Sequence, residues 1–250
     1  GENSAGAGTY DIRGGSSGDT LTGSAQVDTL TGNGGDDTLQ GKAGDDTMTG
    51  GAGNDTFKVD VGSDIITDLG GAAGGDSDVL TVSDGATANV TNVKNFVAGA
   101  TTTSNSSGTV NISTHTDGGI VNMTAASGGY NLTGQGGVDT LSGGKGDDII
   151  NGGVNADTIS GGTGDDTLSG GADNDQMTGG DGVDTFKVDA GTDTITDLGG
   201  TAGGQTDVLI VSNGATANAT NIANFTAGST TKNEGTANLT TKVGGGTIDV

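Results

Sequence analysis

Residues 32–58 decide the fold, and they read GNGGDDTLQ, GKAGDDTMT and GGAGNDTFK in three consecutive nine-residue units. In each unit the sixth residue is Asp and the eighth is apolar. Glycines crowd the first four positions, where a residue without a Cβ atom permits tight turns. The last three residues read polar, apolar, polar, which is typical of a short strand with one buried side chain. Each unit therefore predicts a six-residue turn followed by a three-residue strand.

The same unit extends in both directions and returns later in the chain. The sixth-position aspartates recur in steps of nine without a gap, at Asp19, Asp28, Asp37, Asp46, Asp55 and Asp64, and again at Asp139, Asp148, Asp157, Asp166, Asp175, Asp184 and Asp193. The eighth positions, from Leu21 to Ile66 and from Leu141 to Ile195, are all apolar. A short period sustained over this length is the sequence signature of a solenoid, in which each coil packs on the next.

A longer repeat divides the chain in two. FKVDVGSDIITDLGG at residues 57–71 returns as FKVDAGTDTITDLGG at residues 186–200, a displacement of 129 residues. Each copy opens with a tyrosine, but Tyr10 precedes Phe57 by 47 residues and Tyr130 precedes Phe186 by 56, a difference of one nine-residue unit. We predict two domains: residues 1–125, with a β-roll at about 10–67 and a cap or connector at 68–125, and residues 126–250, with a β-roll at about 130–196 and a cap or connector at 197–250.

The composition leaves little material for a thick core. The 250 residues include 54 Gly, no Pro, no Cys and no Trp, only 2% are aromatic, and the formal net charge is -24. Such a chain would ordinarily stay disordered, because little apolar burial is available to offset chain entropy and charge repulsion. Apart from Glu2 and Glu234, every acidic residue is Asp, whose short carboxylate suits tight turns and cation sites. We therefore expect a bound cation to stabilise the fold.

Stacking of the turns would bring the aspartates together in pairs. If each unit reverses the chain, two units make one coil, and turns 18 residues apart stack on the same side. Two carboxylates about 5 Å apart repel by roughly 0.8 kcal/mol in water, and by several times more in a partly buried site. Calcium accepts about six to eight oxygen ligands in a flexible geometry, whereas magnesium demands a strict octahedron. Ca2+ is therefore the expected cofactor.

The unit resembles the nonapeptide GGxGxDxUx of the RTX family of secreted bacterial proteins, and GGAGNDTFK at residues 50–58 matches it at every defined position. The resemblance covers roughly residues 14–67 and 134–196. It implies an all-β fold built as a right-handed parallel β-roll, here as two tandem calcium-binding rolls joined and capped by non-calcium β segments. It also implies that each ion lies between a turn and the turn two units later, held by both sixth-position aspartates and by backbone carbonyls.

Applied to this sequence, the resemblance predicts about nine Ca2+ ions. The aspartate pairs are Asp19 with Asp37, Asp28 with Asp46, Asp37 with Asp55, Asp46 with Asp64, Asp139 with Asp157, Asp148 with Asp166, Asp157 with Asp175, Asp166 with Asp184, and Asp175 with Asp193. The carbonyl ligands would come from first-position Gly32, Gly41, Gly50, Gly152, Gly161, Gly170 and Gly179, second-position Gly15, Asn33, Gly144, Gly153 and Gly162, third-position Gly34, Ala43, Ala52, Thr163 and Ala172, and fourth-position Ser17, Gly35, Gly44, Gly137, Gly146 and Gly164. Turns that depart from the pattern are expected to be weaker, namely those with Ser24 and Gln26, with Asn155, with Asp173, and those of Asp64 and Asp193 without leading glycines.

Segments outside the pattern carry further expectations. Whether Asp68, Asp78, Asp197 and Asp207, just beyond the rolls, also bind metal is left open. The fifth-position residues Asp36, Asp45, Asp147 and Asp165 are expected to point to solvent. Buried strands are predicted at DVLTV, residues 78–82, and at DVLIV, residues 207–211. We expect a helical turn at the end of each roll, at residues 91–96 and 220–225. Residues 109–133 predict further β-coils without calcium turns.

Whole modules are similar to segments of RTX surface-layer proteins and adhesins of Gram-negative bacteria. This resemblance implies type I secretion, folding outside the cell and a structural or interaction role at the bacterial cell surface, with calcium, further copies of the chain or a cell-surface glycan as partners. A glycan-binding or ice-binding adhesin module is an alternative, because outward Thr20, Thr38 and Thr56, with Thr29 and Thr47, would form flat rows. A third possibility is the non-catalytic calcium domain of a secreted RTX hydrolase.

Other classes of function find little support in the sequence. The only histidine, His115, lies in the polar stretch STHTDGG, and no Cys or recognisable nucleophilic constellation accompanies it, so we predict no catalytic residues and no enzyme activity. The eight Lys and Arg residues are spread singly, which argues against nucleic acid as a partner. No apolar run reaches membrane-spanning length, so membrane insertion is not expected.

Overall fold

The computed structural model describes residues 2–4, 8–70, 76–99, 101–104, 108–199, 207–222, 224–227, 231–241 and 247–249. The chain forms two compact units, one of residues 1–115 and 120–131 and the other of residues 116–119 and 132–250, and the division falls within β15 (Asn131–Thr133). Every regular element in the described ranges is a β-strand, which confirms the predicted all-β class. No helix in those ranges is long and apolar enough to cross a membrane. The module boundary at residue 125 stays a prediction.

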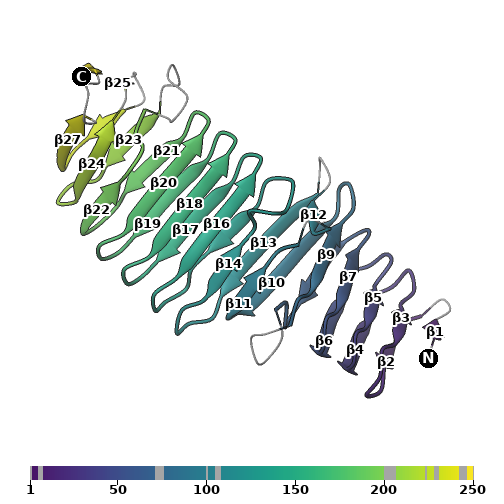
Figure 1. Cartoon of the computed structure of the whole chain (residues 1–250). Helices are drawn as coiled ribbons and strands as arrows, with labels where there is room; N and C mark the ends of the chain where they lie inside the picture. Colours follow the sequence, from purple (N-terminus) through teal and green to yellow (C-terminus); the bar gives the residue numbers. More distant parts are fainter. Residues whose placement is uncertain are drawn as a thin grey trace. The chain divides into compact units, whose positions relative to one another are not determined.

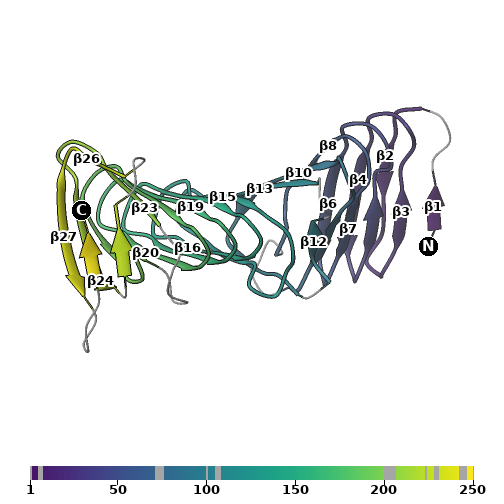
Figure 2. The ribbon, with the colours of Figure 1, turned by 90° about the horizontal axis from the view of Figure 1, so that it is seen from above.

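In the first unit, short parallel strands alternate between two sheets (Figure 1). One sheet contains β1 (Glu2–Ser4), β3 (Thr20–Thr22), β5 (Thr38–Gln40), β7 (Thr56–Val59), β9 (Val79–Val82) and β12 (Thr103–Ser104), and the other contains β2 (Asp11–Arg13), β4 (Thr29–Gly34), β6 (Thr47–Ala52), β8 (Ser63–Ile66), β10 (Thr87–Val93) and β13 (Thr109–Thr114). Leu21 aligns with Leu39, and Leu39 with Phe57, so each coil of the roll contains two nine-residue units. Figure 2 shows strands β2 to β8 side by side as a stack of narrow coils.

The second unit repeats this arrangement. One sheet contains β17 (Ile149–Gly153), β19 (Thr167–Gly171), β21 (Thr185–Val188), β23 (Val208–Val211) and β26 (Lys232–Asn233), and the other contains β16 (Thr140–Lys145), β18 (Thr158–Thr163), β20 (Gln176–Asp181), β22 (Thr192–Ile195), β24 (Thr216–Ile222) and β27 (Thr236–Thr241). Ile159 aligns with Met177, and Met177 with Ile195, again at intervals of two units. Both rolls are therefore parallel β-rolls, as predicted.

A single file of apolar side chains lines the inner face of each sheet. All the eighth-position residues are buried, namely Leu21, Leu30, Leu39, Met48, Phe57 and Ile66, and Leu141, Ile150, Ile159, Leu168, Met177, Phe186 and Ile195. Their neighbours at positions seven and nine face outward, as the alternation of a strand requires. The prediction that the eighth positions point inward is confirmed, and the core is correspondingly thin.

Because the core is thin, loss of one large side chain should be costly. We expect Phe186→Ala to lower the free energy of unfolding of the calcium-saturated chain by about 3–5 kcal/mol, since a fully buried ring would leave a cavity that the coils on either side cannot fill. Urea denaturation in excess calcium measures this loss. Val183→Ala is the matched control, because Val183 is apolar, lies on the turn before the same strand and is 43% exposed. An equal loss in both variants would contradict the prediction.

Beyond each roll, the coils gain a third strand. In the first unit β11 (Asn95–Val97) pairs with β14 (Ile120–Asn122), and in the second β25 (Asn224–Thr226) pairs with β28 (Thr247–Asp249). The predicted buried strands at 78–82 and 207–211 are β9 and β23, and the β-coils predicted over 109–133 are present as β13, β14 and β15.

The helical turns predicted at the roll ends are wrong. Residues 91–96 lie mostly in β10 and β11, and the described part of 220–225 lies in β24 and β25. The reason is the partner strand: within this segment Val93 aligns with Thr114 of β13 and β11 pairs in parallel with β14, so backbone groups are used between coils and not within a helix.

Candidate metal sites between stacked turns

The turns of the rolls use backbone conformations that favour glycine. Most second and fourth positions lie in the left-handed region, as in Gly162 and Gly164, with φ of 121° and 127°. Asn155 and Asp173, which replace fourth-position glycines, keep φ of 76° and 77°, so these two turns retain the common shape. Ser24 and Gln26 have no positive φ, so the turn of Asp28 lacks this shape, as does the turn of Asp19 at Gly15 and Ser17.

The sixth-position aspartates stack in two columns in each unit. Within each column, the main-chain N–H of the earlier aspartate of a pair donates a hydrogen bond to Oδ1 of the aspartate 18 residues later, as from Asp19 to Asp37 at 2.6 Å and from Asp166 to Asp184 at 2.9 Å. All nine predicted pairs are joined in this way, with N···O distances of 2.6 to 3.1 Å. The structure thus brings together the two aspartates of every predicted pair; their role as metal ligands stays a prediction.

The other carboxylate oxygen is buried in most of these aspartates. All of them are buried except Asp19, which is half-buried. Within the described ranges, Oδ2 has no hydrogen-bond partner in Asp37, Asp46, Asp64, Asp157, Asp166, Asp175, Asp184 and Asp193. An unsatisfied buried polar atom costs about 1–3 kcal/mol, and more when it is charged. A cation bound against these oxygens would remove that cost.

These oxygens face the first-position glycines. A methyl group added to Gly161 would overlap Oδ2 of Asp166 and lie 2.7 Å from the carbonyl oxygen of Gly179. At Gly170, an added methyl group would meet the carboxylates of both Asp175 and Asp193, the latter at 2.9 Å. A carboxylate oxygen and a carbonyl oxygen therefore converge on a space that only glycine leaves open. Hard oxygen ligands of both kinds suit calcium, so the residues present fit this ion.

The remaining ligands must come from the backbone. The described part of the chain holds no group of three or more His, Cys, Asp or Glu side chains that could bind a metal, so each site depends on two carboxylates and on carbonyls. The predicted turns are shorter than six residues in places, because strands such as β4, β6 and β18 run on into the first three positions of the next unit, where many of the predicted carbonyl residues lie. Several of these carbonyls already accept backbone hydrogen bonds: Gly153 from Ala172 at 2.9 Å, and Thr163 from Gly146 at 2.7 Å. Because a carbonyl oxygen has two lone pairs, each retains one for an ion.

The buried carboxylates of the columns are stabilised by neutralisation, either through a bound cation or through protonation. Burial raises the pKa of Asp184 and Asp193 to about 7 and that of Asp166 to about 6. Hydrogen bonds from backbone amides act in the opposite direction but are outweighed, and carboxylates of neighbouring coils raise these pKa values further. Without a cation, the charged form of the columns is therefore disfavoured in the folded chain.

The fifth-position aspartates form a second ladder, which the sequence analysis missed. Asp36 and Asp165 are exposed, but Oδ1 of each accepts a hydrogen bond from the main-chain N–H 18 residues later, at 2.9 and 2.8 Å. Asp45 and Asp147 do the same, and Asn174 replaces the carboxylate with an amide. The expectation that these four side chains are exposed to solvent is confirmed, but it did not include their hydrogen bonds to the next coil. The signal was the repeated Asp or Asn at position five, whose short side chain reaches a nearby amide.

Adjacent aspartates in one turn should thus respond differently to neutralisation. Asp37→Asn removes a carboxylate shared by two predicted sites, so we expect fewer bound ions and a rise on the order of tenfold in the calcium concentration at half-saturation, because affinity depends on ligand charge. Asp36→Asn is the matched control and should leave calcium binding unchanged, since Asn174 shows that an amide fills this position. Calorimetric titration measures both; equal effects would contradict the prediction.

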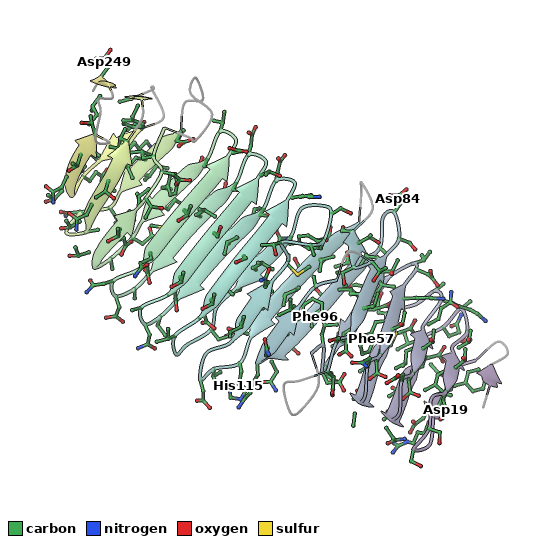
Figure 3. All side chains as sticks on the ribbon, viewed as in Figure 1. Asp19, Phe57, Asp84, Phe96, His115 and Asp249 are labelled. Atoms are coloured by element: carbon green, nitrogen blue, oxygen red, sulfur yellow. The ribbon has the colours of Figure 1, made fainter. Side chains whose placement is uncertain are left out.

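Two of the four aspartates beyond the rolls lie in the same columns. The main-chain N–H of Asp55 donates to Oδ1 of Asp78 at 2.8 Å, and that of Asp184 donates to Oδ1 of Asp207 at 3.0 Å. Asp68 and Asp197 instead accept hydrogen bonds from the first two amides of the turn below, Gly50 and Gly51, or Gly179 and Gly180. His115, labelled in Figure 3, directly follows β13 and lies outside both blocks of nine-residue units in the sequence.

The comparison with protein families agrees with this geometry. The family model for the RTX calcium-binding nonapeptide repeat matches four times, over residues 13–47, 31–66, 133–168 and 160–195. These ranges coincide with the two rolls and end where the three-stranded coils begin. None of the curated proteins compared with the chain matches it. The chain therefore carries two blocks of RTX calcium-binding nonapeptide repeats, and these blocks form its two β-rolls.

Proposed function

We propose that the chain is a non-catalytic structural module that binds about nine Ca2+ ions, folds outside the bacterial cell and forms part of a surface-layer or adhesin-like repeat protein. The observation that carries the proposal is the stacking of nine aspartate pairs, each with its carboxylates in adjacent coils. A fold that buries so many carboxylates depends on the cation that neutralises them.

Such dependence links folding to compartment. Extracellular calcium modules bind with dissociation constants of about 0.1–1 mM, far above the submicromolar concentration of the cytosol. The chain would then remain unfolded during export, with a net charge of -24 to keep it soluble, and would fold on meeting external calcium. The tandem modules and the stacking of parallel coils support a role as a rigid spacer or array element.

A ligand-binding role is the second candidate, because threonines do form rows. Thr20, Thr38 and Thr56 align across β3, β5 and β7. On the other sheet of the first unit, Thr29 and Thr47 are followed by Ile65, and in the second unit Gln176 interrupts the corresponding row. Because these threonine rows are short and interrupted, they offer little regular surface for a glycan or ice to bind, so we favour the structural role.

The test is a titration in buffers of fixed free calcium, followed by circular dichroism and light scattering. We expect folding with a midpoint between about 0.1 and 1 mM, no folding with magnesium, and calcium-dependent sheets or fibres by electron microscopy. A chain already folded at submicromolar calcium would refute folding outside the cell. Binding in a glycan array, or inhibition of ice recrystallisation, without ordered assembly would favour the second candidate.

A further inference from the structure

In each unit, one of the two aspartate columns continues one step beyond the nonapeptide repeats. Asp78 follows Asp55 by 23 residues and Asp207 follows Asp184 by the same interval, in place of the regular 18. The contacts are nevertheless those of the regular pairs, because the earlier N–H donates to Oδ1 of the later aspartate. Asp78 and Asp207 are 3% and 1% exposed, so the late carboxylates are as deeply buried as those inside the rolls.

An unsatisfied carboxylate oxygen lies in the last turn of this column in the second roll. Oδ2 of Asp184 is buried and lacks a hydrogen-bond partner among the described residues, while the residue itself is 1% exposed. A methyl group added to Gly179 would overlap this oxygen, which marks the same glycine-lined space as in the regular sites. Oδ2 of Asp207 accepts a hydrogen bond from Gly199 at 2.6 Å, so the late carboxylate is held in place from the connector side.

The coil architecture does not by itself demand an aspartate at this step. In the other column of each unit, the residue aligned with the last aspartate is an alanine: Ala88 beside Asp64, and Ala217 beside Asp193. Both alanines are fully buried. One column thus ends in a methyl group and the other in a carboxylate, and this difference occurs in both modules.

We propose that each roll is closed by an additional calcium site outside the nonapeptide repeats, between Asp55 and Asp78 in the first unit and between Asp184 and Asp207 in the second. The inference rests on the proposed calcium-binding function of the rolls and raises the number of ions from nine to eleven. The site carries more negative charge than those within the rolls, because Asp197, or Asp68 in the first unit, lies on the first amides of the same turn.

An ion in this position would fasten the connector to the roll. Asp207 immediately precedes β23, which pairs with β21 through Val208 and Thr185, and Asp78 immediately precedes β9 in the same manner. Each site therefore joins the last calcium-binding turn of its column to β9 or β23, the first strand that follows no nonapeptide turn.

Anomalous diffraction from crystals of the unaltered chain grown in calcium tests the proposal directly. We expect a calcium peak between Asp184 and Asp207 and another between Asp55 and Asp78. Peaks between the regular pairs with none at these two positions would overturn the closing sites and leave the function of the rolls intact. An absence of peaks throughout would overturn the calcium function itself.

Counting ions in solution supplies a second test. The double variant Asp78→Asn with Asp207→Asn should bind two ions fewer per chain than the unaltered chain. The control is Asp84→Asn, which removes a charge from the exposed turn after β9 (Figure 3), where the second module carries Asn213 at the equivalent position. An unchanged ion count in a folded double variant would overturn the proposal, and if that variant fails to fold, the anomalous peaks decide.

Discussion

Withdrawing calcium at pH 7.5 is expected to abolish the β-structure of both rolls. Strands in a sheet lie about 4.8 Å apart, so each charged carboxylate in a column would stand about 5 Å from the next. Their repulsion amounts to about 3 kcal/mol per pair at an effective dielectric constant near 20, and it recurs at every coil. A core one side chain deep on each sheet has little apolar burial to oppose it.

Circular dichroism and hydrogen exchange before and after dialysis against chelator measure this effect. The strand signal should disappear, return fully on adding calcium, and fail to return with magnesium, which tolerates irregular cages of carbonyls poorly. A sodium chloride control at matched ionic strength separates specific binding from screening. Amides of the rolls that remained protected in chelator would contradict the prediction.

Protons should partly replace calcium when the pH is lowered. In the folded chain without ions, burial raises the pKa of Asp55, Asp64, Asp184 and Asp193 to about 7 and of Asp157 and Asp166 to about 6, from the ordinary value of 3.8. Because these pKa values lie above those of the unfolded chain, the folded chain binds more protons, and protonation stabilises it. This stabilisation is complete below about pH 4 and is lost as the pH rises through 6 and 7.

The measurement is a pH titration of chain freed of calcium by resin, since chelators lose affinity in acid. We expect strand signal to appear between pH 7 and pH 4, and calcium affinity to fall over the same interval because the ion displaces protons. The net charge vanishes near the isoelectric point of 4.1, so sedimentation velocity must establish that the acid form is monomeric. A chain that stays unfolded at pH 4 would refute the argument.

The sequence allowed the rolls to be predicted almost residue by residue, and the reason is their period. Nine residues per half-coil fix which side chains align, so Leu21, Leu39 and Phe57 had to lie in one column once two units were assigned to a coil. The pairing of Asp37 with Asp55 followed from the same count. Tertiary structure adds little freedom here, because each coil touches only its neighbours.

Where the period fails, prediction failed with it. The spacing of 23 residues between Asp55 and Asp78 is not a multiple of nine, so the repeat period does not predict this pair, and only the structure shows that the column continues. The segment 91–96 was mistaken for a helical turn because short polar and apolar runs do not distinguish the two structures until a partner strand is known. The fifth-position ladder was overlooked because exposure was taken as a lack of contact, although Asp36 is exposed and still hydrogen-bonded.

The two side-chain ladders have a mechanical consequence. Sixth-position carboxylates accept amides from the preceding coil, as Asp37 does from Asp19, whereas fifth-position side chains accept amides from the following one, as Asp36 does from Asn54. Adjacent residues of a single turn are thus hydrogen-bonded to both neighbouring coils. A force along the axis of the roll would act on every coil in series. No coil could shift past its neighbour without breaking hydrogen bonds of both kinds. Under tension, a filament of this kind would peel from its ends, one coil at a time, and its interior would hold its register until the last turns parted.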